Sequence, residues 1–371
     1  MKRVVIASGG TGGHIFPALA VAEAMKRRFP QVQLLFIGGD KGPEAALARE
    51  SGLDFQGLPA RGVLGKGLGK SPGTVWWLVK SFVQCRGLYR RFDPELVIGF
   101  GSYASFVPVF LACLQKRITA IHEQNSGPGV SNKMLGKRVA RIFLSFADAK
   151  HRFDQKKVMI TGNPVRPELI DAGSRAAKNY GNNQTGENVL VLGGSQGARA
   201  INEAIVKALP SLKMHDVRLW HQTGARDVEK IRQAYADAAM DPEQVCGFIQ
   251  DMAEAYAWSD LVISRAGAST VAELMTVGRP SVLIPFPYAT GRHQLTNARE
   301  LEKQGAAMVL DQSYLEAVDL GKLITDLLAA PDQLLDMGRA ARRLGRPEAA
   351  SCIVEELERM HQEQKGRSLQ V

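Results

Sequence analysis

A histidine in a glycine-rich turn is the first residue of this sequence that could do chemistry. The stretch "ASGGTGGHIFPALA", residues 7–20, follows a β-branched run and precedes apolar residues at helical spacing, so it predicts a strand, a turn and a helix. Free N–H groups and the helix dipole make such a turn an anion-binding site. His14 could act there as a general base, or its side chain could hydrogen-bond the backbone near the helix start, and this turn alone favours neither.

Two common nucleotide-binding fingerprints are absent from this turn. The dinucleotide motif GxGxxG fails because its last glycine, counted from Gly10, would fall on Ile15. The P-loop motif fails because no Lys-Ser/Thr pair follows. The turn is therefore expected to bind an anionic group other than NAD or an ATP held by a Walker lysine.

A second turn with candidate chemistry lies within residues 259–287, "SDLVISRAGASTVAELMTVGRPSVLIPFP". This pattern predicts a strand, a turn and a helix that begins near Val271. The backbone N–H groups of residues 268–270 could receive a diphosphate. Glu273 has two interpretations: it closes a capping box with Thr270, or it accepts hydrogen bonds from a ribose diol. The spacing alone favours the capping box.

Signatures of metal sites and of serine hydrolases are absent. The sequence has no Asp-x-Asp pair, no HExxH motif and no GxSxG elbow, and its four cysteines form no CxxC pair. The sequence thus offers several anion-binding turns and no metal-binding motif. This combination favours a nucleotide-diphosphate leaving group that is stabilised by helix dipoles and arginine side chains.

Strands and helices must position these turns. Apolar runs alternate with helical stretches along the chain, and this alternation predicts parallel, doubly wound α/β sheets. The first set of predicted strands covers residues 3–8, 33–39, 95–101, 118–124, 141–147 and 158–164. The pattern breaks at "NPVRP" and restarts with a second strand, glycine turn and helix at residues 188–205. Later strands are expected at residues 217–224, 245–251, 260–267 and 281–287.

The sequence therefore predicts two Rossmann-like domains that face each other across a cleft, with a ligand bridging their glycine turns. The first domain is expected to span residues 1–163 and the second 164–344. A C-terminal helix at about residues 345–362 is expected to pack back on the first domain. The uncharged stretch 96–114 is long enough for a transmembrane span, but its glycines and proline indicate a buried strand, a turn and a helix.

Basic residues and tryptophans gather in residues 61–92, in a chain of net charge +10. This stretch carries seven Lys or Arg and no Asp or Glu, beside "TVWWLVKSF". An anionic membrane surface attracts such a segment, a nucleic acid is the competing partner, and a core helix with a solvated basic back is the third interpretation. One helical face is expected to join the core: Val75, Leu78, Phe82 and Tyr89. A membrane contact is expected for Trp76, Trp77 and Lys80.

Seven segments, taken in order along the whole chain, closely resemble the MurG family of bacterial cell-wall N-acetylglucosaminyltransferases. They are "GGTGGHIFPALA", "HEQN", "TGNPVR", "GGSQGA", "HQTG", "FIQDMAEAYAWSDLVISRAGASTVAE" and "GRPSVLIPFP". The resemblance implies a GT-B-type fold and an inverting transfer of GlcNAc from UDP-GlcNAc to the C4 hydroxyl of undecaprenyl-linked N-acetylmuramoyl-pentapeptide. It implies no cofactor, no metal ion and no nucleic-acid partner. It also implies a peripheral location at the cytoplasmic face of the inner membrane, reached through the first domain.

The same resemblance implies site residues. His14 is the candidate general base. The residues implied to contact UDP-GlcNAc, chiefly in the second domain, are Thr11, Gly12, Gly13, Asn125, Arg166, Ser195, Ile249, Ala268, Ser269, Thr270, Val271, Ala272, Glu273 and Gln294. Two other functions stay open: a UDP-GlcNAc 2-epimerase on the same fold, which would turn over UDP-GlcNAc alone, and a non-catalytic nucleic-acid binder, whose binding would weaken with salt.

Overall fold

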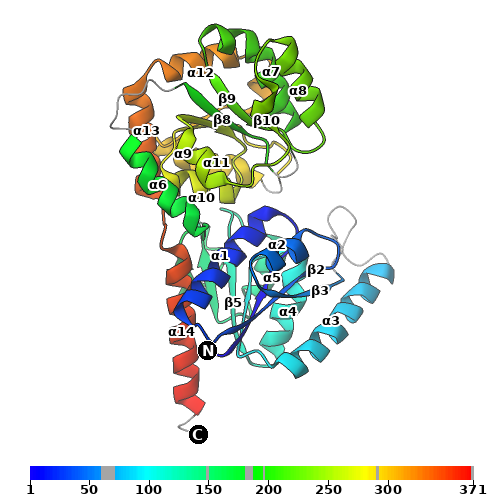
Figure 1. Ribbon diagram of the computed structural model, residues 1–371. Helices are drawn as coiled ribbons and strands as arrows, with labels where there is room; N and C mark the ends of the chain where they lie inside the picture. Colours follow the sequence, from blue (N-terminus) through cyan, green and yellow to red (C-terminus); the bar gives the residue numbers. More distant parts are fainter. Residues whose placement is uncertain (60–71, 148–149, 180–186, 195–196, 290–291, 369–371) are drawn as a thin grey trace. The chain divides into compact units, whose positions relative to one another are not determined.

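The chain divides into two compact units, which are described one at a time. The computed structural model describes residues 1–59, 72–147, 150–179, 187–194, 197–289 and 292–368 (Figure 1). The first unit comprises Met1–Arg166 and Pro347–Val371, and the second comprises Pro167–Arg346. The sequence placed these divisions after residues 163 and 344. The last segment of the chain therefore belongs to the same unit as its beginning.

A parallel sheet forms the centre of the first unit. Over the described residues it has seven strands in the order β3-β2-β1-β4-β5-β6-β7. The strands are β1 (Arg3–Ala7), β2 (Gln33–Gly39), β3 (Asp54–Leu58), β4 (Leu96–Gly99), β5 (Ile118–Glu123), β6 (Arg141–Leu144) and β7 (Val158–Ile160). The winding direction changes between β1 and β4, and ligands of such sheets bind beyond the carboxyl ends of the strands at this point.

Helices cover both faces of this sheet. Successive residues of each strand point to opposite faces, so alternate side chains enter two different apolar cores. Val4 and Ile6 of β1 pack in one apolar core with residues of α1 (Gly12–Arg28), α2 (Glu44–Glu50) and α14 (Ala349–Ser368). Val5 and Ala7 pack in the other, with residues of α3 (Pro72–Phe92), α4 (Ser102–Leu114) and α5 (Val130–Leu135). Continuous apolar strands are thus explained by a sheet that is covered on both faces.

The C-terminal helix α14 completes the first core, as Figure 1 shows by its course beside α1. Ile353, Val354 and Leu357 are buried in the core with Val4 and Ile6. Ion pairs join the helix to the unit at its edges, with Arg28 to Glu358 at 3.1 Å and Arg141 to Glu356 at 2.6 Å. Apolar burial and these charges together hold the returning segment on the unit that begins the chain.

A second parallel sheet forms the centre of the second unit. Its described strands follow the order β10-β9-β8-β11-β12-β13. They are β8 (Asn188–Leu192), β9 (Arg218–Gln222), β10 (Val245–Cys246), β11 (Leu261–Ser264), β12 (Ser281–Leu283) and β13 (Met308–Val309). The helices of this unit are α6 (Pro167–Asn179), α7 (Arg199–Met214), α8 (Val228–Asp237), α9 (Met252–Trp258), α10 (Ala268–Val277), α11 (His293–Lys303), α12 (Leu320–Leu328) and α13 (Pro331–Leu344).

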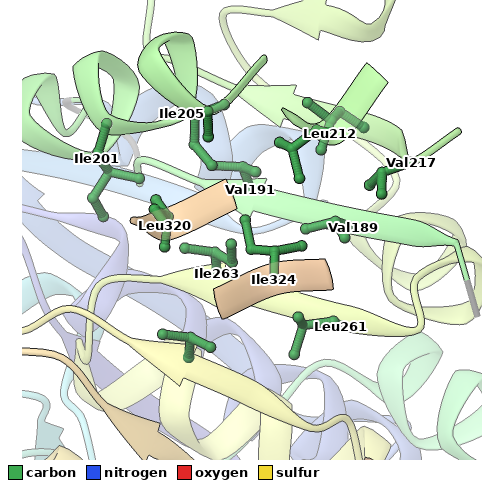
Figure 2. Packing of buried hydrophobic residues seen from close by; sticks show 14 of the residues in the cluster. Val189, Val191, Ile201, Ile205, Leu212, Val217, Leu261, Ile263, Leu320 and Ile324 are labelled. Carbon is green, nitrogen blue, oxygen red and sulfur yellow. The ribbon is translucent and has the colours of Figure 1, made fainter. Parts of the chain in front are cut away.

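The core of the second unit, like those of the first, consists of apolar strand residues that pack against apolar helix residues. Figure 2 shows Val189 and Val191 of β8 and Ile263 of β11 gathered in one cluster with Ile205 of α7 and Ile324 of α12. All five side chains are fully buried. The prediction of two doubly wound α/β domains is confirmed by these two parallel sheets.

Two edge strands were not predicted, and the local sequence explains why. Strand β3, "DFQGL", carries a charge, an amide and a glycine, and β13 has only two residues. Stretch 96–114 divides into β4 and α4 with Gly101 at φ +82° between them, as the sequence indicated. Among the described helices, none has the length and apolar character needed to cross a membrane.

Candidate functional site

The glycine turn after β1 lies at the carboxyl edge of the first sheet, at the point where the winding direction changes. Gly10 has φ +91°, and its backbone N–H donates to Glu44 Oε1 at 2.7 Å. A Cβ on Gly9 would lie 2.6 Å from the same oxygen and 2.8 Å from the Ala104 Cβ. Glu44 is buried and was missed by the sequence analysis, since nothing in "GPEAAL" marks it. It fixes the turn on which His14 is mounted.

The imidazole of His14 contacts a glutamine side chain. Its Nδ1 lies 2.9 Å from Gln124 Oε1, and Gln124 Nε2 donates to the Phe100 carbonyl oxygen at 3.0 Å. A Cβ on Gly101 would lie 3.1 Å from Nδ1, so the ring packs against a position that only glycine leaves open. The interpretation in which the side chain merely bonds the backbone is wrong, because the ring partner is Gln124. Within the described part of the chain, His14 Nε2 has no hydrogen-bond partner.

Asn125 is held next to this pair by a buried carboxylate. Glu123 Oε1 accepts from the Asn125 backbone N–H at 3.1 Å. Its Oε2 accepts from the Gly129 N–H at 3.0 Å and from Asn132 Nδ2 at 2.9 Å. The loop that follows β5 is therefore closed around one acid, and this fixes the position from which Asn125 can reach a ligand.

A second buried histidine, His122, supports the same loop. Its Nε2–H donates to the Gly162 carbonyl oxygen at 3.1 Å, which ties β5 to the segment that leads to Arg166. Burial lowers the pKa of His122 to about 4, and the proximity of His14 acts in the same direction. His122 is therefore neutral at neutral pH and acts as structural support. The Arg166 guanidinium lies over the Phe16 ring, 4.9 Å from its centroid.

The turn after β11 opens helix α10 without a side-chain cap. The helix begins at Ala268, and its N-cap is Gly267, which has no side chain. The N–H groups of the first turn and the positive end of the dipole are therefore presented to an anion, as the sequence predicted for residues 268–270. Ser269 and Thr270 are half-buried, while Val271 and Ala272 belong to the core. Of these four residues, Ser269 and Thr270 are the ones whose side chains a ligand at this turn could contact.

The capping-box interpretation of Glu273 is wrong. Because α10 begins three residues earlier than predicted, Thr270 occupies the third helical position and cannot be the N-cap. The Glu273 carboxylate instead accepts a hydrogen bond from the hydroxyl of Tyr256 on α9, at 3.0 Å. Tyr256 is buried, and no motif in the sequence marks it as part of a site. The ribose interpretation of Glu273 stays a prediction.

Arginine and glutamine side chains frame the same edge of the second sheet. Arg265 Nη1 donates to the Ile284 carbonyl oxygen at 3.0 Å, and its guanidinium lies over the Phe286 ring, 5.4 Å from the centroid. Burial lowers the pKa of Arg265 to about 10, so it stays charged at neutral pH. Gln294 Oε1 accepts from the Phe286 N–H at 2.9 Å.

The remaining predicted donor contacts divide between the units. Thr11, Gly12 and Gly13 belong to the first unit, and the Ile249 side chain is buried in the second. Ile249 can therefore offer a ligand its backbone but little of its side chain. Its neighbour Phe248 is 56% exposed and presents an aromatic face that the sequence analysis did not single out. Ser195 lies outside the described residues.

Beneath the turn after β8, His221 is buried with both ring nitrogens bonded. Its Nδ1 lies 3.0 Å from the Tyr235 hydroxyl and its Nε2 lies 3.1 Å from Asn202 Oδ1. Burial lowers the pKa of His221 to about 3, so the ring is neutral. A Cβ on Gly197 would lie 2.5 Å from the Thr223 carbonyl oxygen. The Gly193 N–H donates to the Gln222 carbonyl oxygen at 2.9 Å. The "HQTG" segment thus contacts Gly193 and Gly197 of the glycine turn "GGSQGA".

The two tryptophans of α3 have different environments. Trp76 is 70% exposed and Lys80 is also exposed, whereas Trp77 is only 9% exposed. The expectation that both rings meet a membrane is therefore corrected for Trp77, whose side chain is buried. On the expected core face, Tyr89 is buried and Leu78 is half-buried, and the Val75 side chain lies outside the described ones.

Comparisons with known proteins give a consistent result for both halves of the chain. Residues 4–144 match the glycosyltransferase family 28 N-terminal domain, and residues 188–353 match the glycosyltransferase family 28 C-terminal domain. A protein of Nitratidesulfovibrio vulgaris (strain Miyazaki F) is 48% identical over 96% of this chain and 97% of its own length. A protein of Lawsonia intracellularis is 44% identical over 96% of each chain. Both bear the name UDP-N-acetylglucosamine--N-acetylmuramyl-(pentapeptide) pyrophosphoryl-undecaprenol N-acetylglucosamine transferase.

Solved structures agree with these relatives. The crystal structure of Acinetobacter baumannii MurG superposes with a TM-score of 0.76 at 30% identity, over 97% of this chain and 100% of that one. A UDP-N-acetylglucosamine 2-epimerase structure superposes with a TM-score of 0.66 at 15% identity, over 96% of this chain and 95% of that one. The second likeness shows a shared fold and nothing more.

Proposed function

Because the chain belongs to the MurG family within glycosyltransferase family 28, we propose that it moves GlcNAc from UDP-GlcNAc to the C4 hydroxyl of the lipid-linked N-acetylmuramoyl-pentapeptide. The chain is a glycosyltransferase of peptidoglycan synthesis, and through the cell wall it serves cell shape and division. Its two parallel-sheet units are the two halves of a GT-B-type fold. The observation that carries the mechanism is the held imidazole of His14.

In the proposed reaction, His14 Nε2 accepts the proton of the acceptor hydroxyl. The acceptor oxygen forms a bond to C1 of GlcNAc while the bond from C1 to the β-phosphate oxygen breaks, and UDP leaves with the bonding electrons. Attack from the face opposite the leaving group inverts C1 through a cation-like sugar, as in inverting glycoside hydrolysis. The geometry supports this role because Gln124 holds Nδ1 at 2.9 Å while Nε2 is unbonded within the described residues.

We assign the donor mainly to the second unit. The uncapped first turn of α10, with Ser269 and Thr270, binds the diphosphate, whose growing charge in the transition state it stabilises. Glu273, oriented by Tyr256, accepts the ribose hydroxyls. The Phe248 ring is exposed beside Ile249 and offers a stacking surface for the uracil base. In this proposal these groups carry the leaving-group chemistry without a divalent cation.

The experiment that tests the base is the His14→Ala variant. A positioned general base contributes roughly 10²–10⁴-fold to the rate, so kcat should fall by about that factor. The KM for UDP-GlcNAc and the affinity for UDP should change little, because the diphosphate is assigned to α10. Transfer of radiolabelled GlcNAc to acceptor measures kcat, and calorimetry measures UDP binding. Wild-type turnover by this variant would remove His14 from the mechanism.

We further propose that the first unit meets the membrane through the outer face of α3, defined by Trp76, Val79, Lys80, Val83 and Arg90. At 3.6 residues per turn these five positions share one side of the helix, and all five are exposed. Apolar side chains among basic ones are suited to an anionic lipid surface. This surface would hold the enzyme peripherally at the cytoplasmic face of the inner membrane, where its lipid-linked acceptor lies.

Neighbouring helices extend this surface. Helices α3, α4 and α5 pack on the same face of the first sheet, and α4 contacts both of the others. Further exposed apolar side chains lie on α4 and α5: Leu114, Val130 and Met134. A basic residue lies among them, because Lys133 is exposed on α5. The apolar and basic character of α3 therefore continues over adjacent elements.

A further inference from the structure

We propose that Gln124 is a positioning residue that fixes the tautomer and the orientation of His14. The inference rests on the proposed function, in which His14 Nε2 accepts the proton of the acceptor hydroxyl. Gln124 itself is 1% exposed, and its amide oxygen lies 2.9 Å from Nδ1 of the His14 ring. It follows the buried acid Glu123 directly in the chain, so the β5 edge that holds Asn125 also holds Gln124.

The hydrogen bonds of the Gln124 amide define its direction. Its Nε2 donates to the Phe100 carbonyl oxygen at 3.0 Å, and a carbonyl oxygen can only accept. The amide oxygen must therefore face His14, where Oε1 lies 2.9 Å from Nδ1. Because Oε1 cannot donate either, Nδ1 must carry the proton. The lone pair of the neutral ring is then on Nε2, the atom that a base needs.

The surroundings of the ring allow it little freedom to leave this position. Gly101 has φ +82°, and its missing side chain is what admits the ring, since a Cβ there would lie 3.1 Å from Nδ1 and 3.2 Å from Cε1. The other titratable ring nearby, His122, is kept neutral by burial and bonds Gly162 instead. Gln124 is thus the group that decides which nitrogen of His14 carries the proton.

A neutral amide does less than a carboxylate in this position. The acid of a serine-protease triad orients its histidine and also stabilises the imidazolium that forms. Gln124 orients the ring but supplies no charge, so its removal should cost only part of the roughly 10²–10⁴-fold that a positioned base contributes. We expect Gln124→Met, which keeps the length of the side chain and lacks the acceptor, to lower kcat by about 10- to 100-fold.

The decisive measurement is the ¹⁵N spectrum of the histidine rings, with His14 assigned by its absence in His14→Ala. Wild-type protein at a pH where the ring is neutral should show His14 protonated at Nδ1, and Gln124→Met should move the proton toward Nε2. A wild-type ring protonated at Nε2 would overturn the inference. This readout does not depend on turnover, so it distinguishes a failure of this inference from a failure of the His14 assignment, which His14→Ala tests.

Kinetics supply the second readout. The double variant His14→Ala with Gln124→Met should be no slower than His14→Ala, because Gln124 acts only through the ring. Gln124→Glu retains an acceptor oxygen for Nδ1 and adds a charge, so it should move the acidic limb of the kcat/KM pH profile to higher pH. The matched control is Gln56→Met, an exposed glutamine on β3, which should leave rate and spectrum unchanged. Additive losses in the double variant would contradict the positioning role.

Discussion

At the scale of single residues, the candidate site is a set of polar groups that are each held by a buried partner. Glu44 holds the turn beneath His14, Gln124 holds the His14 ring, and Tyr256 holds the Glu273 carboxylate. The partners are all buried, which keeps each functional group in one orientation before a ligand binds. These supporting residues are the part of the site that spacing along the sequence did not reveal.

Glu273 and Tyr256 give a prediction at this scale. Hydrogen bonds to a charged acceptor contribute about 1.5–3 kcal/mol against about 1 kcal/mol for neutral ones, so Glu273→Gln should raise the KM for UDP-GlcNAc by about 10-fold. The melting temperature should change little, because the carboxylate caps no helix. Tyr256→Phe should raise the same KM by a smaller factor. Steady-state kinetics and calorimetric melting measure both.

A ligand that lacks the ribose 2′-hydroxyl provides the control for this pair. Wild type should bind UDP more tightly than 2′-deoxy-UDP, and Glu273→Gln should bind the two almost equally. If the Glu273→Gln variant keeps the wild-type preference for UDP, the ribose assignment fails.

At the scale of the elements, the sequence predicted strand and helix where apolar periodicity was long, and failed where it was short. Buried strands such as β1 and β8 have continuous apolar runs and were found, whereas the two-residue β13 carries too little pattern. The start of α10 was placed three residues late, because Thr270 and Glu273 match a capping box while the true N-cap, Gly267, uses no side chain. That one boundary decided the interpretation of Glu273.

The outer face of α3 gives the prediction at this scale. Replacing Trp76, Val79 and Val83 together by Gln keeps helix propensity but removes apolar surface, and each such side chain contributes roughly 1.5–3 kcal/mol when fully buried. Since about 1.4 kcal/mol is a factor of ten, binding to anionic vesicles should weaken by at least about 10-fold. The KM for a long-chain acceptor should rise, and that for a short soluble analogue should not.

Met214→Gln is the matched control, because Met214 is an equally exposed apolar residue on α7 of the second unit. Vesicle sedimentation at low and high salt measures binding, and salt should weaken the basic contribution. Equal vesicle binding by the triple variant and wild type would show that the membrane contact lies elsewhere. Salt-sensitive binding to duplex nucleic acid with no affinity for UDP would instead favour the nucleic-acid interpretation.

At the scale of the whole molecule, two parallel-sheet units each present glycine turns at the carboxyl edge of their sheet. This repetition was readable from the sequence, since "ASGGTGG" and "VLGGSQG" each follow an apolar run and precede a helix. The sequence also predicts a division at the interruption "NPVRP", and the first compact unit ends at Arg166 within it. Which atoms face one another within a unit was not, because contacts such as His14 with Gln124 join residues 110 positions apart.

The same fold also occurs in a UDP-GlcNAc 2-epimerase, so the most direct test of the account is whether turnover of UDP-GlcNAc requires the acceptor. UDP release should be measured with the lipid-linked muramoyl-pentapeptide present and absent, with His14→Ala as the matched control. We predict UDP release only with acceptor, in equal amount to the GlcNAc transferred, and a loss of about 10²–10⁴-fold in the variant. Conversion of UDP-GlcNAc without acceptor, or no UDP release with it, would contradict the account.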